Sequence, residues 1–166
     1  TVLPGYTVPK ILWMKQHEAE NFARIKTILL PHDYINFWLT GIKRMEYGDA
    51  SGTGMLDVRK REWCDEIIEY VDSSLREKLP QLGSSLDLHG TLRSALVDEW
   101  GLEGEVLISA GGGDNMMGAI GTGNVQSGII TDQPNRKYLN SILDANQLVS
   151  AYDMVNLEGI FPGVHR

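Results

Sequence analysis

The sequence predicts a helix-rich α/β domain that is incomplete within this chain. Most apolar residues recur at helical spacing, whereas only Val106–Ile108 is predicted to be a short buried strand. Three glycines, Gly111–Gly113, and an apolar helix follow it, which is a strand–turn–helix unit of the α/β class. Because a lone strand cannot make a sheet, we expect the domain to be incomplete.

Two helices are expected in the first forty residues. The first covers Pro9 to about Ile28, since proline suits the first helical turn, where its missing N–H costs nothing. The second begins at Pro31 and ends at Gly41, a residue type that commonly ends helices. Thr1–Thr7 is predicted to be an entry loop.

The middle of the chain alternates turns and helices. Asp49–Thr53 is expected to be a compact polar loop or a short helical turn, because glycines flank it. Trp63–Leu75 and Thr91–Trp100 are predicted helices, and Pro80–Gly90 is the predicted loop between them.

Composition excludes several classes of protein. The 166 residues contain 42% hydrophobic and 22% charged residues, as in soluble globular domains. The net charge of -7 argues against binding to nucleic acid or to an anionic membrane, since both attract clustered Lys and Arg. A single cysteine cannot form an internal disulfide, so a cytoplasmic location is expected.

The glycine turn before Asp114 allows three interpretations. A dinucleotide site does not fit, because the glycine spacing is wrong and this carboxylate would repel phosphate. Asp114 could cap the helix, since aspartate is among the best N-cap residues. It could also be a general base or a hydroxyl acceptor at the ligand-binding edge of a sheet, with Asn115 contacting a polyol. Spacing alone leaves the last two open.

Other candidate side chains give weaker signals. The four histidines share no metal-ligand spacing, so no metal site is predicted. Cys64 is expected to be a half-buried packing residue rather than a nucleophile. Asp49 with Ser51 and Thr53 could hold a substrate or an ion, but local hydrogen bonds to the backbone explain the same residues.

Aromatic and acidic residues also have simple explanations. Tyr6 and Trp13 could stack on a ligand, although core packing is the expectation. Asp65, Glu66 and Glu69 are predicted to form a solvated helix face.

Four stretches resemble the FGGY carbohydrate kinases, and most closely the xylulose kinases among them. They are LPGYTVPKILWMKQHE (Leu3–Glu18), LLPHDYINFWLTG (Leu29–Gly41), GDASGTGMLDVRKREWCDEI (Gly48–Ile67) and AGGGDNMMGAIGTG (Ala110–Gly123). They occur in the family's order with similar gaps, and the ordered set is specific. The resemblance makes residues 1–131 part of an FGGY kinase N-terminal domain, and residues 132–166 an unassigned tail without a counterpart.

The resemblance implies a fold and a reaction. The fold is the ribonuclease H-like (actin-like ATPase) fold, with the active site in the cleft between two domains. The reaction transfers the γ-phosphoryl group of ATP, with Mg²⁺, to a sugar hydroxyl, and in xylulose kinases it converts D-xylulose to D-xylulose 5-phosphate. The Asp of the GGGDN element is the family's general base, which assigns that role to Asp114, and the following Asn assigns a sugar contact to Asn115.

Departures from the family pattern limit what the chain itself should do. The family's two phosphate-binding turns and its second domain have no counterpart in these 166 residues, so the cofactor-binding residues stay unassigned and no metal ligand is assigned. The chain alone is expected to be inactive. Its expected partners are the sugar, the remainder of the kinase and, through an exposed apolar face, a second copy in a homodimer. The alternative is a non-catalytic interaction module or a decayed paralogue in which Asp114 is only a helix cap.

Overall fold

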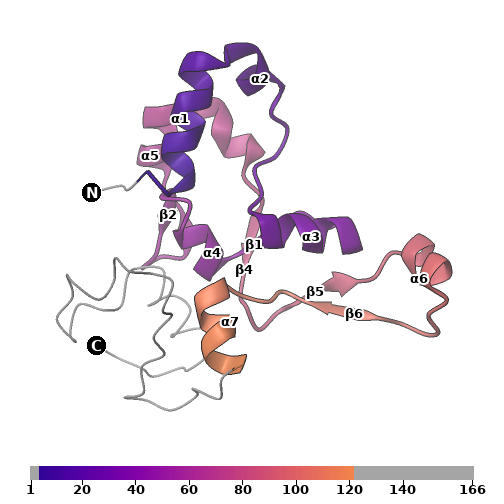
Figure 1. Cartoon of the computed structure of the whole chain (residues 1–166). Helices are drawn as coiled ribbons and strands as arrows, with labels where there is room; N and C mark the ends of the chain where they lie inside the picture. The colour runs from indigo at the N-terminus through magenta and orange to yellow at the C-terminus, as the bar shows by residue number, and fades with distance from the viewer. Residues whose placement is uncertain (1–3, 122–166) are drawn as a thin grey trace.

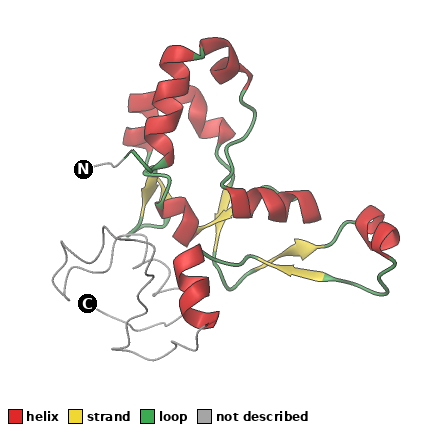
Figure 2. Ribbon diagram, viewed as in Figure 1, coloured by secondary structure: helices red, strands yellow, loops and turns green. Residues whose placement is uncertain are grey.

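The computed structural model describes residues 4–121, which form a helix-rich α/β structure (Figure 1, Figure 2). Among these residues no helix is long and apolar enough to cross a membrane. In chain order the elements are α1 (Thr7–His17), α2 (Ala19–Arg24), α3 (Pro31–Thr40), β1 (Arg44–Glu46), α4 (Tyr47–Ser51), β2 (Leu56–Asp57), β3 (Glu62–Trp63), α5 (Asp65–Val71), the 3-10 helix η1 (Ser73–Lys78), β4 (Gln81–Gly83), β5 (Leu88–Thr91), α6 (Ser94–Trp100), β6 (Leu107–Ser109) and α7 (Asp114–Gly121).

The first predicted helix is two helices, so the prediction of one helix to Ile28 is wrong. Glu18 adopts φ -134° and ψ 54°, outside the helical region, and ends α1. The chain then turns into α2, which brings Phe22 onto the apolar core with 8% of its surface exposed. Tertiary packing therefore overrides a helical pattern that looked continuous.

The second predicted helix is confirmed as α3. Pro31 occupies its first turn, and Gly41 ends it in the left-handed conformation with φ 84°. The polar residues Asp33 and Asn36 are buried on this short helix. Since Trp38 is 44% exposed, α3 turns polar side chains inward and an aromatic ring outward.

The predicted helix Trp63–Leu75 is also divided. Trp63 belongs to β3, α5 ends at Val71, and Asp72 is fully extended with φ -174°. The Asp72 side chain then accepts a hydrogen bond from the backbone N–H of Ser74 and caps η1. An aspartate that can cap a new turn competes with continuation of the helix.

Within residues 4–121, three two-stranded sheets take the place of the single expected strand. β1 pairs in parallel with β4, β2 pairs antiparallel with β3, and β5 pairs antiparallel with β6. The prediction of a loop over Pro80–Gly90 is therefore wrong, because this stretch contains β4 and most of β5. Strands of two to four residues are too short to show alternation, and pairing across distance specifies them.

The apolar core lies among α1, α2, β1, α4, α5 and η1. Its fully buried side chains include Met45, Met55, Ile68 and Leu75, each at most 1% exposed. The predicted inward position of Val71 is confirmed, with 3% exposure. The acidic face of α5 is exposed, as predicted.

The pair β5–β6 forms an arm that carries α6 at its far end (Figure 1). The predicted burial of the β6 strand is wrong, because Leu107 is 59% exposed and β5 is the only strand that pairs with β6 in residues 4–121. The helix predicted from Thr91 begins only at Ser94, but it ends as expected at Gly101, with φ 63°. The arm returns the chain to Ala110, where the glycine turn begins.

Candidate functional site

Asp114 is the first residue of α7, directly after the glycine turn. The predicted strand–turn–helix unit is confirmed here, since β6 ends at Ser109 and α7 begins five residues later. The carbonyl of Gly113 accepts the N–H of Met117 at 3.0 Å, which makes Gly113 the N-cap residue. Asp114 is exposed and stands one position inside the helix. The carboxylate therefore opens toward solvent at the positive end of the helix.

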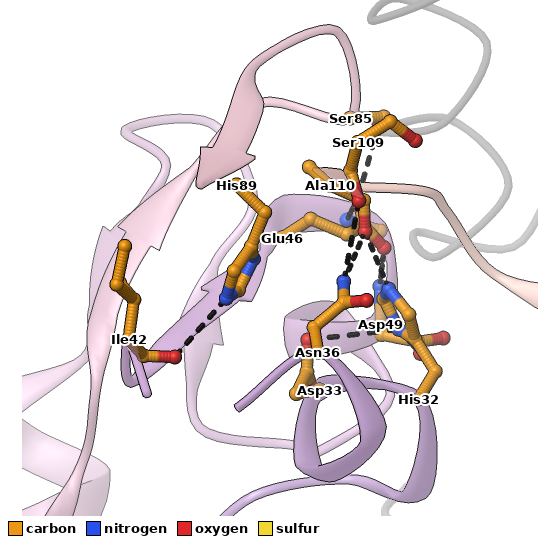
Figure 3. A network of polar contacts seen from close by, with 11 residues as sticks. His32, Asp33, Asn36, Ile42, Glu46, Asp49, Ser85, His89, Ser109 and Ala110 are labelled. Atoms are coloured by element: carbon orange, nitrogen blue, oxygen red, sulfur yellow. Dashed lines mark hydrogen bonds and ion pairs between the residues drawn. The ribbon is translucent and has the colours of Figure 1, made fainter. Parts of the chain in front are cut away.

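Ala110 fixes the start of the turn through both of its backbone groups. Its N–H donates to the carbonyl of Asp87 at 3.0 Å. Its carbonyl accepts the side-chain amide of Asn36 at 2.9 Å and Nε2 of His32 at 2.7 Å (Figure 3). Gly111 follows with φ +74°, a conformation that favours glycine. The turn is therefore anchored from α3 as well as from the chain before β5.

His32 uses both ring nitrogens in hydrogen bonds. Nε2 must carry a proton, because the Ala110 carbonyl can only accept, and Nδ1 lies 2.7 Å from Oδ2 of Asp49. The hydrogen bond to Asp49 is the main cause that raises the pKa of His32 from 6.5 to about 9, and burial of the ring opposes this rise. At neutral pH this side chain is therefore an imidazolium that donates to α4 and to the glycine turn.

Asp33 is a buried carboxyl beside this imidazolium. It is 1% exposed, Oδ1 lies 3.5 Å from Nδ1 of His32, and Oδ2 has no hydrogen-bond partner. Burial is the main cause that raises the pKa of Asp33 to about 7, while the charge of His32 opposes the shift. Close to neutral pH, Asp33 is therefore held near its own titration midpoint.

Glu46 organises the short helix α4 that carries Asp49. Its carboxylate accepts the backbone N–H groups of Gly48 and Asp49, as an N-cap does, and also the hydroxyl of Ser85 at 3.1 Å. Burial raises the pKa of Glu46, and the backbone hydrogen bonds oppose that rise. Because the Glu46 cap fixes the start of α4, the Asp49 carboxylate is held in a position facing His32 (Figure 3).

The residues around Asp49 divide between local bonding and long-range contact. Ser51 donates to the carbonyl of Gly48 at 2.7 Å, and Thr53 donates to that of Ala50 at 2.6 Å. Local bonding, the prediction for these hydroxyls, is confirmed. Asp49 differs, because its carboxylate bonds to a residue 17 positions earlier in the chain.

Two other sequence-based interpretations have different outcomes. Cys64 is half-buried, as expected, and its thiol lies 3.1 Å from a carboxylate oxygen of Glu66. Core packing is wrong for Trp13, which is 53% exposed and lies against the ring of His17 at 5.1 Å, because this face of α1 points away from the core. Tyr6 is half-buried.

His32, Asp33 and Asp49 form the one group in the described residues whose atoms could together hold a metal ion, all within 4.8 Å. Both ring nitrogens of His32 already donate hydrogen bonds, so neither offers a lone pair. Mg²⁺ prefers an octahedral set of oxygen ligands and retains water, whereas Asp33 is sealed from solvent. This group therefore does not fit Mg²⁺.

Sequence reasoning does not identify His32 as a site residue, because the histidines share no metal-ligand spacing. Its two partners lie 17 and 78 residues away along the chain, which no local pattern reveals. The one available signal was its position beside Pro31 at the start of a helix that also carries Asp33 and Asn36. Asn115 belongs to α7, but its side chain lies outside the described part, as do residues 132–166.

Comparison with known proteins places these elements in a family. Residues 1–121 match the FGGY family of carbohydrate kinases, N-terminal domain. The chain is 48% identical over 129 residues to a xylulose kinase of Haemophilus influenzae and 40% identical over 126 residues to one of Escherichia coli K12, in each case covering 76% of this chain and 26% of the relative.

The structure leads to the same group of proteins. A crystal structure described as a xyloylose kinase from Brucella ovis superposes with a TM-score of 0.71 at 39% identity, over 75% of this chain and 26% of that one. The chain thus spans about a quarter of the length of the relatives it matches. A match over residues 1–121, supported by the superposition, decides the assignment: this chain belongs to the FGGY family of carbohydrate kinases.

Proposed function

We propose that this chain is the later part of the N-terminal domain of an ATP-dependent kinase that converts D-xylulose to D-xylulose 5-phosphate, with Asp114 as the general base. The observation that carries the proposal is the exposed carboxylate at the start of α7, one position past the N-cap residue Gly113. The names of the two xylulose kinases reported above support the choice of sugar.

The proposed reaction requires Asp114 to accept one proton. As a sugar hydroxyl attacks the γ-phosphorus of ATP, its proton passes to the carboxylate and the bond from the γ-phosphorus to the leaving oxygen breaks. Such general-base assistance is worth about 10²–10⁴-fold in rate. The positive end of the helix stabilises the Asp114 carboxylate, and the glycine turn lets a sugar hydroxyl approach it. The negative charge of this carboxylate disfavours a phosphate group at the same point.

The cofactors belong to other parts of the proposed enzyme. The acidic group at His32 does not fit Mg²⁺, and the described residues offer no second candidate group, so no step is assigned to the metal here. ATP and Mg²⁺ are proposed to supply the phosphoryl group and its charge neutralisation, which dominates phosphoryl transfer. Asn115 is proposed to contact the sugar.

The wider arrangement follows the family. We assign a ribonuclease H-like (actin-like ATPase) fold, residues 1–131 to the N-terminal domain and residues 132–166 to an unassigned tail, in a cytoplasmic enzyme. The remainder of the kinase is the proposed partner, and a homodimer is a second association. Exposed apolar side chains on the arm, among them Leu88, Leu107 and Trp100, supply surface for such contacts.

The decisive experiment is Asp114→Asn in a chimaeric kinase in which residues 1–121 replace the matching segment of the Haemophilus influenzae relative. We expect the turnover of D-xylulose with MgATP to fall about 10²–10⁴-fold. The fold should persist, because Asp114 is an exposed residue one position past the N-cap, where loss of a carboxylate costs about 0.3–1 kcal/mol. The measurement is coupled detection of ADP, with circular dichroism to check the fold.

The matched control is Asp65→Asn, since Asp65 is also an exposed aspartate that begins a helix, α5. Its turnover should stay within about twofold of the parent. If Asp114→Asn keeps full turnover, Asp114 is a helix-end residue and not the base. If the parent chimaera itself has no turnover, the alternative of a non-catalytic module or a decayed paralogue stands. The 166-residue chain alone is expected to release no ADP above background.

A further inference from the structure

His32 connects three segments that are distant in sequence, and the proposed proton transfer makes no use of it. It begins on α3, reaches Asp49 on α4, and reaches the carbonyl of Ala110 just before the glycine turn. Figure 3 shows the His32 ring between the Asp49 carboxylate and the Ala110 carbonyl. A side chain with two charge-assisted bonds in different directions holds its partners more firmly than a neutral hydrogen bond does.

We propose that the His32 imidazolium, braced by Asp49, is a positioning residue that sets the Gly111–Gly113 turn and thereby the location of Asp114. This inference rests on the proposed role of Asp114 as the base. His32 itself contacts no reacting atom in this account; it acts through the backbone of Ala110.

Close packing at the turn supports the proposal. A Cβ added to Gly111 would lie 3.3 Å from Nε2 of His32, so the ring lies directly against the backbone of the first turn residue. The N–H of Ala110 is held separately by Asp87, and its carbonyl also accepts Asn36. The peptide before Ala110 is therefore held by the chain before β5, and His32 and Asn36 determine the orientation of the next peptide, between Ala110 and Gly111.

A metal ion is the competing occupant of this cluster. It would have to remove a proton from a ring nitrogen that now donates to Asp49 or Ala110. The Ala110 carbonyl would then lose its charged donor, and the turn would lose the anchor described above. The observed bonds therefore favour the protonated, metal-free arrangement, and a metal titration can test it.

The positioning role predicts a pH limit. The charged groups that act on the ring are Asp49 on α4 and Asp33 on the same helix, and Glu46 at the end of β1 acts in turn on Asp33. His89 on β5, whose own pKa is lowered chiefly by burial, also interacts with the charge of His32. Asp33 and Asp49 both favour the charged ring, which places the pKa of His32 at about 9. The anchor is therefore complete at neutral pH, and one of its two donors is lost as pH rises through about 9.

The first experiment compares His32→Ala, His32→Gln and His32→Lys in the same chimaeric kinase. Loss of both donors in His32→Ala should lower kcat about 10–100-fold with little change in the KM for ATP, because a misplaced base costs turnover. Lysine keeps a charged donor with a reference pKa of about 10.4, so His32→Lys should recover most of kcat. The alkaline fall of kcat near pH 9 should move upward in His32→Lys and disappear in His32→Gln.

The control is His17→Ala, an exposed histidine on α1 outside the polar cluster, which should keep both kcat and the alkaline fall. Failure of this inference differs from failure of the proposed function. Full kcat and an unchanged pH profile in His32→Gln, while Asp114→Asn is inactive, would overturn the positioning role alone. Full kcat in Asp114→Asn would overturn the proposed role of Asp114 as the general base.

A second experiment does not depend on activity. In the 166-residue chain labelled with ¹⁵N, both ring nitrogens of His32 should be protonated at pH 7, and the Gly111–Gly113 amide signals should shift together with the ring near pH 9. A ring that titrates near 6.5, or glycine signals that ignore it, would overturn the proposal. So would binding of added Zn²⁺ to a His32 nitrogen at pH 7.

Discussion

The apolar core and the polar cluster hold the molecule together in different ways. The core, made of the buried side chains that include Met45, Met55, Ile68 and Leu75, joins helices through non-directional contact. The polar cluster consists of His32, Asp33, Asn36, Glu46, Asp49 and the Ala110 carbonyl, and most of its bonds have one defined partner. The volumes of the side chains therefore determine how the core packs, whereas the direction and charge of hydrogen bonds determine how the polar cluster is arranged.

This difference assigns separate tasks to the two regions. The core reaches β1 and α4, which also carry polar residues of the cluster, but most of it joins α1, α2, α5 and η1, which lie away from α7 (Figure 1). Each group of the polar cluster stabilises the fold less than a core side chain does. Burial of Asp33 and Glu46 costs free energy that their hydrogen bonds offset only in part. The polar cluster fixes the Ala110 carbonyl, which bonds to a side chain 78 residues earlier in the chain.

The largest expected effect is a loss of stability in the core. Leu75 is 0% exposed, so Leu75→Ala should lower the free energy of unfolding by about 2–5 kcal/mol, measured by urea denaturation. The pKa of His32, followed by NMR, should stay at about 9, because the leucine belongs to the other region. A pKa of His32 that moves with this cavity would show that the two regions are not separate.

A smaller effect is expected at the glycine turn. Gly111→Ala should cost about 1–2 kcal/mol for the left-handed conformation, and it should disturb the adjacent His32 ring. Gly101→Ala is the matched control: Gly101 has φ +63°, but nothing lies within 4 Å of an added Cβ. Denaturation should show similar strain in both variants. Only Gly111→Ala should change the titration of His32, and an equal change in both would contradict the contact.

The smallest effect is expected in the pH dependence of stability. The raised pKa of Asp33 means that its contribution is complete below about pH 3.8 and is lost as pH rises through about 7, since the folded state binds the extra proton. Asp33→Asn should therefore flatten the fall in unfolding free energy between pH 4 and 5.5 by on the order of 1 kcal/mol. Below about pH 5.5 His32 is almost fully protonated in both states, so this window isolates Asp33 from it.

The exposed aspartate Asp98 on α6 provides the control for this measurement. Asp98→Asn should leave the slope of unfolding free energy against pH unchanged. If Asp33→Asn also leaves it unchanged, Asp33 is ionised throughout the range, and the polar cluster carries more charge than proposed.

Much of the local structure could be predicted from the sequence. Pro31 and Gly41 bracket α3, and Gly101 ends α6, because fixed or left-handed backbone conformations are properties of single residues. The glycine turn and the helix beginning at Asp114 followed from composition in the same way. The breaks at Glu18 and Asp72 could not be predicted, because apolar spacing continues across both and only packing decides against a longer helix.

The sequence by itself determined the family, the strand–turn–helix unit and the aspartate at its start, since ordered motifs and glycine chemistry are local information. The tertiary structure alone decided that His32 and Asp49 meet, that Asp33 is buried beside them, and that the Ala110 carbonyl receives their charged donor. Such contacts join residues up to 78 positions apart, and their strength depends on burial and direction. Neither property is defined until the chain has folded.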